Sequence, residues 1–234
     1  GESVKGCTSE RWLAPCFSGK DAQSVLFCLM IRRPPSSTLF PYTTLFRSAK
    51  LNIADMKPSL VFLDARDGSF IRKIELPAEL HKNSIRHLDT GPDGTVMFGM
   101  QYQGDASDAP PLVGMIGRDG KSVLFDPPET QSAGLKGYCA DVAIDASGKF
   151  GASTFPRGDR IAIWSIPDGK LVSFNGVRDS AGVAAGPHPG GFRFSTGFGK
   201  RLSRIADTAA HVTEGHTQRF AGLAFDNHMT VLER

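Results

Sequence analysis

The sequence predicts an all-β protein, a partial and open β-propeller that amounts to about half of a seven-bladed ring of the WD/YVTN-like kind. Three hairpins share one design, two apolar runs around an Asp-Gly turn, at Ser59–Ile74, Leu112–Phe125 and Ile161–Phe174. Asp-Gly between β-forming runs favours a tight hairpin, because Gly adopts positive φ freely. Turn glycines Gly94, Gly148 and Gly190 recur at spacings of 54 and 42 residues, close to the period of four-stranded propeller blades.

The first 49 residues differ from the rest of the chain. Met30–Ser48 closely resembles a translated sequencing-adapter peptide, apart from Ser36, where that peptide has Arg. We therefore expect residues 1–49 to be a non-native or disordered segment, with the true N-terminus and any export signal missing; the alternatives are an irregular N-terminal arm and a membrane anchor. Val25–Ile31 is apolar but too short to span a bilayer. Arg32 and Arg33 follow this run, which is the wrong side for a signal peptide.

Residues 50–234 form the predicted propeller domain. Its expected strand pairs are Ser59–Asp64 with Phe70–Leu76, Ser84–Thr90 with Thr95–Tyr102, Leu112–Gly117 with Lys121–Phe125, Asp141–Asp145 with Phe150–Thr154, Ile161–Ile166 with Leu171–Phe174, Ala181–Ala185 with Gly191–Thr196, Lys200–Ile205 with His211–Glu214, and Phe220–Phe225 with His228–Leu232. Asp126–Gly137, with two prolines, is expected to be an irregular loop. The count predicts three nearly complete blades between Ile85 and Glu214, with half a blade on either side, and hence a fragment of a longer protein.

Side-chain size predicts which strands lie near the propeller axis. Ala140–Ile144 and Ala181–Ala185 are rich in Val, Ala and Gly, which fit crowded inner strands. Phe62, Phe125 and Trp164 lie in the partner hairpins and suit wider outer positions. A single blade cannot bury both of its faces, so blades must stack face to face.

Charge and cysteine content exclude some functions. The net charge of +3 lies entirely in residues 1–48, which hold six Lys/Arg and three Asp/Glu, whereas the remainder holds twenty-one of each. The basic excess is therefore no argument for nucleic-acid or membrane binding. Cys139 is the one cysteine after residue 48 and is expected to be buried and inert. No Cys or His pair has the spacing of a local metal site.

From about Lys50 onward the chain resembles an uncharacterised bacterial family, domain of unknown function 1513. The matching runs are Lys50–Asn52, Met56–Asp64, Leu76–His81, Ser84–Leu88, Gln101–Gly104, Pro110–Gly114 and Asp226–His228. The resemblance implies a seven-bladed, propeller-like protein exported to the periplasm, and it implies an association with iron-uptake components. On this resemblance, we expect the family's N-terminal blades and export signal to be missing from this sequence.

One set of polar side chains is the best candidate site, because several of its members fall at strand ends or in loops, where propellers gather ligand groups. Its members are Glu79, His81, Arg86, His87, Gln101, Tyr102, Gln103, Asn227 and His228. One hypothesis is binding of an anion or a metal complex, with His as ligand and Arg86 pairing with a carboxylate. The alternative is that these groups only hold the blades together. No catalytic residue and no metal site is assigned, and the cofactor stays unknown.

The sequence therefore favours a non-catalytic periplasmic propeller that binds a partner protein or a small ligand, with iron-uptake components as the expected partners. The alternative is a propeller enzyme of the lactonase or quinoprotein oxidoreductase type. Such an enzyme would need converging metal ligands or a cofactor-binding face, and few acids and aromatic residues fall in suitable loops. Gly182–Gly199 lacks the features of a phosphate loop, and Ser195 is expected in a strand rather than in a nucleophile elbow.

Overall fold

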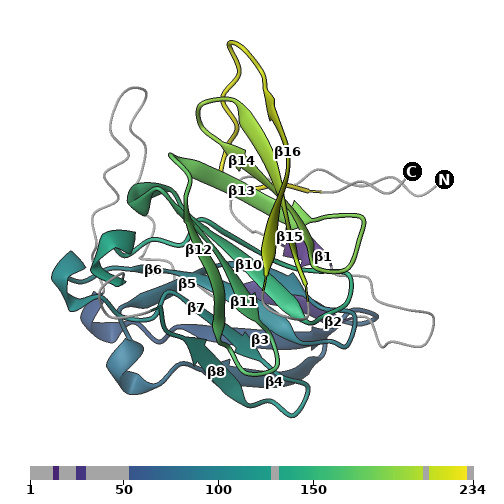
Figure 1. Ribbon diagram of the computed structural model, residues 1–234. Coiled ribbons are helices and arrows are strands. Elements are labelled where there is room, and N and C mark those ends of the chain that lie inside the picture. Colours follow the sequence, from purple (N-terminus) through teal and green to yellow (C-terminus); the bar gives the residue numbers. More distant parts are fainter. Residues whose placement is uncertain (1–12, 16–24, 30–52, 128–131, 208–210, 231–234) are drawn as a thin grey trace, which may run out of the picture.

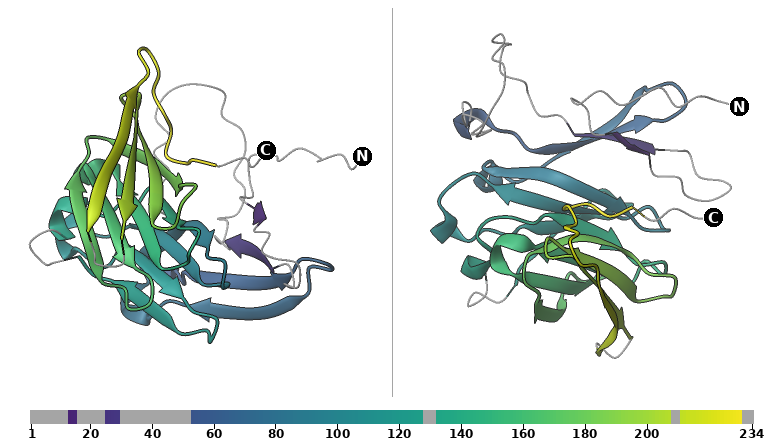
Figure 2. Two further views of the ribbon diagram at one scale, coloured as in Figure 1. Left: turned by 45° about the vertical axis from the view of Figure 1, so that its right-hand side comes forward. Right: turned by 90° about the horizontal axis from the view of Figure 1, so that it is seen from above.

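The computed structural model describes residues 13–15, 25–29, 53–127, 132–207 and 211–230. These residues form four antiparallel sheets of four strands each, which follow one another in chain order as layers (Figure 1, Figure 2). The first blade contains β1 (Leu13–Pro15), β2 (Val25–Leu29), β3 (Ser59–Asp64) and β4 (Phe70–Glu75). The second contains β5 (Asn83–Thr90), β6 (Val96–Tyr102), β7 (Val113–Ile116) and β8 (Ser122–Phe125).

The third and fourth blades repeat this order. The third contains β9 (Asp141–Ile144), β10 (Phe150–Phe155), β11 (Arg160–Ser165) and β12 (Leu171–Gly176). The fourth contains β13 (Ser180–Ala185), β14 (Gly191–Thr196), β15 (Lys200–Ala206) and β16 (Val212–Arg219). Single 3-10 turns join some strands: η1 (Ile53–Asp55), η2 (Ala78–Leu80), η3 (Ala106–Asp108), η4 (Ala133–Leu135) and η5 (Pro156–Gly158). The all-β, propeller-like fold class is confirmed, and the described blades do not close into a ring.

The three Asp-Gly hairpins are confirmed. β3 pairs with β4, β7 with β8 and β11 with β12. Gly68, Gly120 and Gly169 end the respective turns with φ of 73°, 81° and 66°. At these angles a side chain with a Cβ would be strained, so the turn residue is dictated by backbone geometry.

Each pair of neighbouring blades encloses its own apolar cluster. Leu60 and Phe62 of the first blade pack with Phe98 and Met100 of the second. Phe125 of the second blade meets Trp164 of the third, with ring centroids 5.4 Å apart. The indole N–H of Trp164 donates to Ser153 Oγ at 2.8 Å, so its one polar atom is satisfied in the core.

β9 and β13, the two strands predicted from their small side chains to lie near the axis, are adjacent inner strands. β9 lies beside both β5 and β13 and so joins the second, third and fourth blades near the propeller axis. A Cβ on Gly99 would lie 2.8 Å from the sulfur of Cys139, so this glycine lets β6 approach the third blade. Cys139 is fully buried, as expected.

Two expectations about the ends of the domain are wrong. The sheet before β5 has four strands rather than half a blade, because Val25–Leu29 pairs with β3. The final hairpin, Phe220–Phe225 with His228–Leu232, does not form: residues 220–230 contain no strand, and residues 231–232 lie outside the described residues. Pairing along β16 continues to Arg219, five residues beyond the predicted end at Glu214.

The adapter-like segment Met30–Ser48 lies outside the described residues, so its interpretation stays a prediction. Within the described part of the chain, no helix has the length and apolar character needed to cross a bilayer.

Candidate functional site

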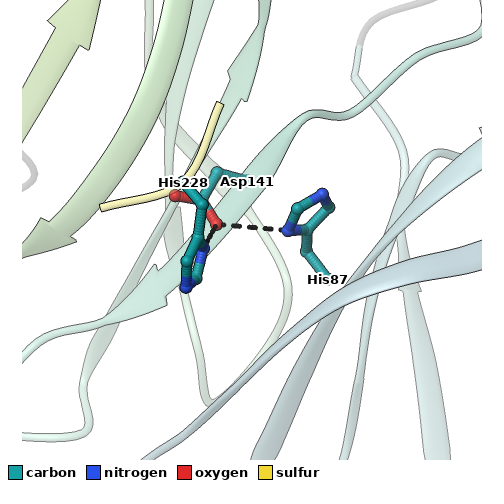
Figure 3. Close-up of side chains that lie close together, drawn as sticks. All are labelled: His87, Asp141 and His228. Carbon is teal, nitrogen blue, oxygen red and sulfur yellow. Dashed lines mark hydrogen bonds and ion pairs between the residues drawn. The ribbon is translucent and has the colours of Figure 1, made fainter. Parts of the chain in front are cut away.

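Three side chains from distant parts of the sequence meet near the propeller axis: His87, Asp141 and His228 (Figure 3). His87 lies on β5, Asp141 begins β9, and His228 belongs to the C-terminal segment, which we define as residues 220–230. Figure 3 shows both imidazole rings directed at the carboxylate between them. We call these three residues the His–Asp–His cluster.

A β-bulge directs His87 toward this cluster. Ile85 pairs with Met100 and His87 pairs with Gly99, so Arg86 is an extra residue in β5. Adjacent residues of β6 face opposite sides of the sheet, so the bulge places His87 on the side of Gly99. That side faces the third blade, because Gly99 packs against Cys139 and Val142.

The potential ligand atoms of the cluster lie within 4.8 Å of one another. Oδ1 of Asp141 is 3.1 Å from Nδ1 of His228 and 3.6 Å from Nδ1 of His87. The Asp141 side chain is 1% exposed, that of His87 is 22% exposed and that of His228 is 58% exposed. The cluster is therefore a buried carboxylate with one half-buried and one accessible imidazole, open to solvent on the His228 side.

Backbone groups fix the other oxygen of Asp141. Oδ2 accepts hydrogen bonds from the N–H of Val183 on β13 at 2.9 Å and from the N–H of Met229 at 3.3 Å. The carboxylate thus connects the third blade to the fourth blade and to the C-terminal segment. Because Oδ2 is held by these donors, Oδ1 is left to face the two imidazoles.

The local environment shifts the pKa values of the two histidines in opposite directions. Burial lowers the pKa of His87, and the attraction of Asp141 only partly offsets it. The hydrogen bond to Asp141 raises the pKa of His228. Close by, Asp89 of β5 accepts from the N–H of Ile144 at 2.7 Å, and burial raises the pKa of Asp89 to about 6.

The C-terminal segment is held against the inner strands by specific contacts. Asn227 Nδ2 donates to the hydroxyl of Tyr138 at 2.7 Å. A Cβ on Gly182 of β13 would lie 3.0 Å from backbone atoms of His228 and Met229. Close backbone approach at a glycine therefore sets the position of His228.

Comparison with protein families gives a clear assignment. The family model described as "Protein of unknown function (DUF1513)" matches residues 43–232. The chain belongs to the DUF1513 family. No curated protein matches the sequence.

Solved structures similar to this DUF1513 protein have different names and low sequence identity. One is a functionally unknown protein from Desulfotomaculum acetoxidans DSM 771, with 12% identity, a TM-score of 0.51, and coverage of 87% of this chain and 66% of that chain. Another is U3-55K, with 12% identity, a TM-score of 0.52, and coverage of 75% and 52%. A third is Kuenenia stuttgartiensis hydrazine synthase, with 15% identity, a TM-score of 0.51, and coverage of 87% and 57%. At these identities the likeness shows the fold alone, and the chain spans between about half and two thirds of the length of these proteins.

In the structure of the DUF1513 protein, only some of the residues predicted from sequence lie at the cluster. His87 and His228 come together, and Arg86 is the exposed bulge residue beside His87. Asn227 adjoins His228 but binds Tyr138 instead of joining the cluster.

The other predicted residues lie near the start of β5, away from His87. Glu79 is in η2, and His81 contacts the carbonyl of Ala78 in the same turn. His87 lies four positions after Asn83, where β5 begins, and four steps along a strand correspond to roughly 13 Å. The predicted set is therefore spread over more than one location.

The start of β5 lies beside Gln101, Tyr102 and Gln103. Gln101 bridges to Tyr138, and the N–H of Gln103 donates to Lys82 at 2.9 Å. The Tyr102 hydroxyl donates to Asp108, and this hydrogen bond raises the pKa of Tyr102 to about 12. These contacts tie loops together at one end of the second blade.

Sequence reasoning missed Asp141, the residue at the centre of the cluster. Its signal was present, because an acid within the small, apolar run Cys139–Ile144 is unusual for a buried strand. No local spacing could have paired it with His87 and His228, which are 54 and 87 residues away.

Proposed function

We propose that this protein is a non-catalytic, propeller-like binding protein whose His–Asp–His cluster holds a divalent transition-metal ion. The observation that carries this proposal is the convergence of two imidazoles on one carboxylate oxygen, at 3.1 and 3.6 Å. Two imidazoles and a carboxylate form a donor set that suits first-row metals such as Fe²⁺ and Zn²⁺.

The separations fit metal coordination. Ligands bound at about 2.1 Å lie roughly 3.0 Å apart at right angles and roughly 3.4 Å apart at tetrahedral angles. Of the two measured separations, 3.1 Å lies within this range and 3.6 Å lies slightly above it, and all the potential ligand atoms lie within 4.8 Å of one another, so movement of the side chains would bring both imidazoles and Oδ1 onto one ion. Three protein ligands leave further positions for water or for the donor atoms of a bound molecule.

The surroundings of Asp141 support a preorganised ligand. The N–H groups of Val183 and Met229 hold Oδ2 and so orient Oδ1 without a bound ion. The ion adds charge that compensates a carboxylate buried in a protein interior, where an isolated charge is costly.

The resemblance of residues 50–234 to an exported family associated with iron uptake supports a specific biological setting. We extend the proposal to a periplasmic role in iron acquisition, with Fe²⁺ as the expected ion and a protein of the uptake system as partner. The two-His, one-carboxylate set is one that Fe²⁺ occupies in proteins.

Anaerobic calorimetric titration of the full chain with Fe²⁺, Mn²⁺ and Zn²⁺ tests the metal site. We expect one ion per chain, with affinity lowered about tenfold or more in His87→Ala and Asp141→Asn. His211→Ala is the matched control, because His211 is exposed and does not belong to the cluster. Binding that is undiminished in both cluster variants, or no binding of any of the three ions, would rule out the metal site.

A further inference from the structure

The two faces of the fourth blade carry different chemistry. Phe192, Phe194 and Leu202 pack against the third blade. Residues alternate across a strand, so the neighbours of these side chains project from the opposite side. We call that opposite side the open face. Cross-strand pairing places Arg193 opposite Ser203 on the open face, with Ser195 opposite Arg201.

The open face does not resemble a blade-packing surface. The corresponding face of the third blade presents Ala152, Ile161 and Ile163 to the fourth blade. On the open face the polar pairs occupy comparable central positions, and Arg193 and Arg201 are exposed. Burying two guanidinium groups under an apolar sheet would be costly. The face therefore suits a polar partner of opposite charge.

A groove of about 360 Å³ lies along this blade. It is bordered by the turn before β14 and by β14, β15 and β16, and its charged or titratable lining residues are Arg193, Arg201, Arg204, His188 and His216. No Asp or Glu lines it. The groove is thus basic, although the propeller domain as a whole has balanced charge.

One residue that lines the groove has a side-chain nitrogen without a hydrogen-bond partner among the described residues. Arg204 is only 7% exposed, and its Nη1 and Nη2 donate to the carbonyl of Ser203 at 2.9 Å and to Glu214 at 2.8 Å. Its buried Nε has no hydrogen-bond partner among the described residues. Arg204 pairs with Phe192 across β14 and β15, so its side chain lies on the face toward the third blade and its Nε is not a donor of the open face.

On the open face, Arg193 and Arg201 retain donors for a partner. Nη2 of Arg201 donates to Gln218 at 2.8 Å, and the guanidinium group lies over the ring of Phe220, 5.6 Å from its centroid; its side chain is exposed. Arg193 makes no hydrogen bond or ion pair with the described residues. Guanidinium groups bind carboxylates with paired hydrogen bonds, so an acidic chain satisfies both of them.

From these observations we propose that the open face of the fourth blade is a docking surface for an extended, acidic segment of a partner protein. Its carboxylates pair with Arg193 and Arg201, and the groove accepts the chain between them. This surface is separate from the His–Asp–His cluster and does not depend on metal binding.

Fluorescence anisotropy with a labelled decapeptide of alternating Glu and Thr tests the proposal on the full chain at low salt. We expect saturable binding that weakens as salt is added. Arg193→Ala combined with Arg201→Ala should weaken it about fivefold to tenfold, as expected for the loss of two exposed charge pairs. A decapeptide of alternating Lys and Thr should not bind.

The matched control removes two positive charges elsewhere. Arg118→Ala with Lys121→Ala changes the exposed turn between β7 and β8 and should leave peptide binding unchanged. Equal loss of binding in the control pair would show general charge attraction and overturn the docking surface. Absence of peptide binding, or tighter binding of a single-stranded DNA decamer that the Arg193 and Arg201 changes abolish, would overturn the choice of an acidic protein segment.

Discussion

The two faces of the fourth blade come from the same four strands, yet one is built for the core and the other for contact with a charged partner. Toward the third blade, Phe192 and Phe194 are almost completely buried. On the open face, Arg193 lies between these two phenylalanines in sequence and is exposed. The comparison shows that strand alternation alone can place a stabilising surface and a candidate recognition surface one residue apart.

The largest expected effect is on the covered face. Phe194→Ala removes a fully buried ring and should lower the free energy of unfolding by about 3–5 kcal/mol. Phe198→Ala, at an exposed position in the turn after β14, should cost less than about 1 kcal/mol. Urea denaturation of both variants measures the difference, and equal costs would contradict the division of the blade into two faces.

The next effect concerns the polar connection between the third and fourth blades. Oδ2 of buried Asp145 accepts from the N–H of Gly190 at 2.7 Å. Asp145→Asn weakens this acceptor and should cost about 2 kcal/mol near neutral pH. Asp126→Asn, at an exposed position, is the matched control and should change stability little.

The same carboxylate should make stability depend on pH. Burial acts to raise the pKa of Asp145, but hydrogen bonds from Ser147, Gly190 and Phe150 outweigh it and hold the pKa below the ordinary value of 3.8. A lowered folded-state pKa contributes stability that is present above pH 3.8 and is lost as pH falls through the folded-state pKa. Denaturation at several pH values should show the cost of Asp145→Asn shrinking below pH 3.8, and a cost that grows there would contradict this account.

A smaller effect is expected where the C-terminal segment covers β13. The added methyl group in Gly182→Ala would press on the backbone of His228 and Met229. If the His–Asp–His cluster binds metal, displacement of His228 should weaken binding by about tenfold. Gly134→Ala is the control, because a Cβ there meets no atom within 4 Å. Calorimetric titration of both variants decides whether the position of the segment matters.

The smallest effect on stability is expected on the open face. Arg193→Leu with Arg201→Leu should change the free energy of unfolding by less than about 1 kcal/mol, because both side chains are exposed. The variant should instead associate as its concentration rises, since it exposes an apolar sheet face. Light scattering after size-exclusion chromatography measures this, and a variant that stays monomeric at all concentrations would contradict the role of the two arginines in keeping the face soluble.

The sequence was sufficient to predict the blades because each hairpin carries local signals. Turn glycines and alternation specify strand pairs such as β11 with β12, and small residues identify β9 and β13 as inner strands. The predicted final hairpin does not form, because backbone N–H groups of this segment bond to other blades: that of Phe225 donates to the carbonyl of Thr196 and that of Met229 donates to Asp141. The β11–β12 hairpin and the predicted final hairpin show the same alternation of apolar and polar residues. Tertiary contacts such as that at Gly182 decide which of the two forms.

The candidate site was only partly predictable. His87 and His228 could be suggested as polar residues at blade ends, but Asp141 joins them only through the arrangement of three blades. The bulge at Arg86 also reverses the side on which His87 projects. One extra residue in a strand leaves no reliable trace in composition or period, so such a reversal has to be seen in the fold.

The sulfur of Cys139 lies sealed between the second and third blades, directly beneath Gly99. Burial raises the pKa of this thiol, and only the thiolate reacts readily with alkylating reagents. Alkylation at this one position therefore has to wait until those two blades part. The rate at which Cys139 is alkylated, followed by peptide mass mapping, therefore measures how often the second and third blades separate.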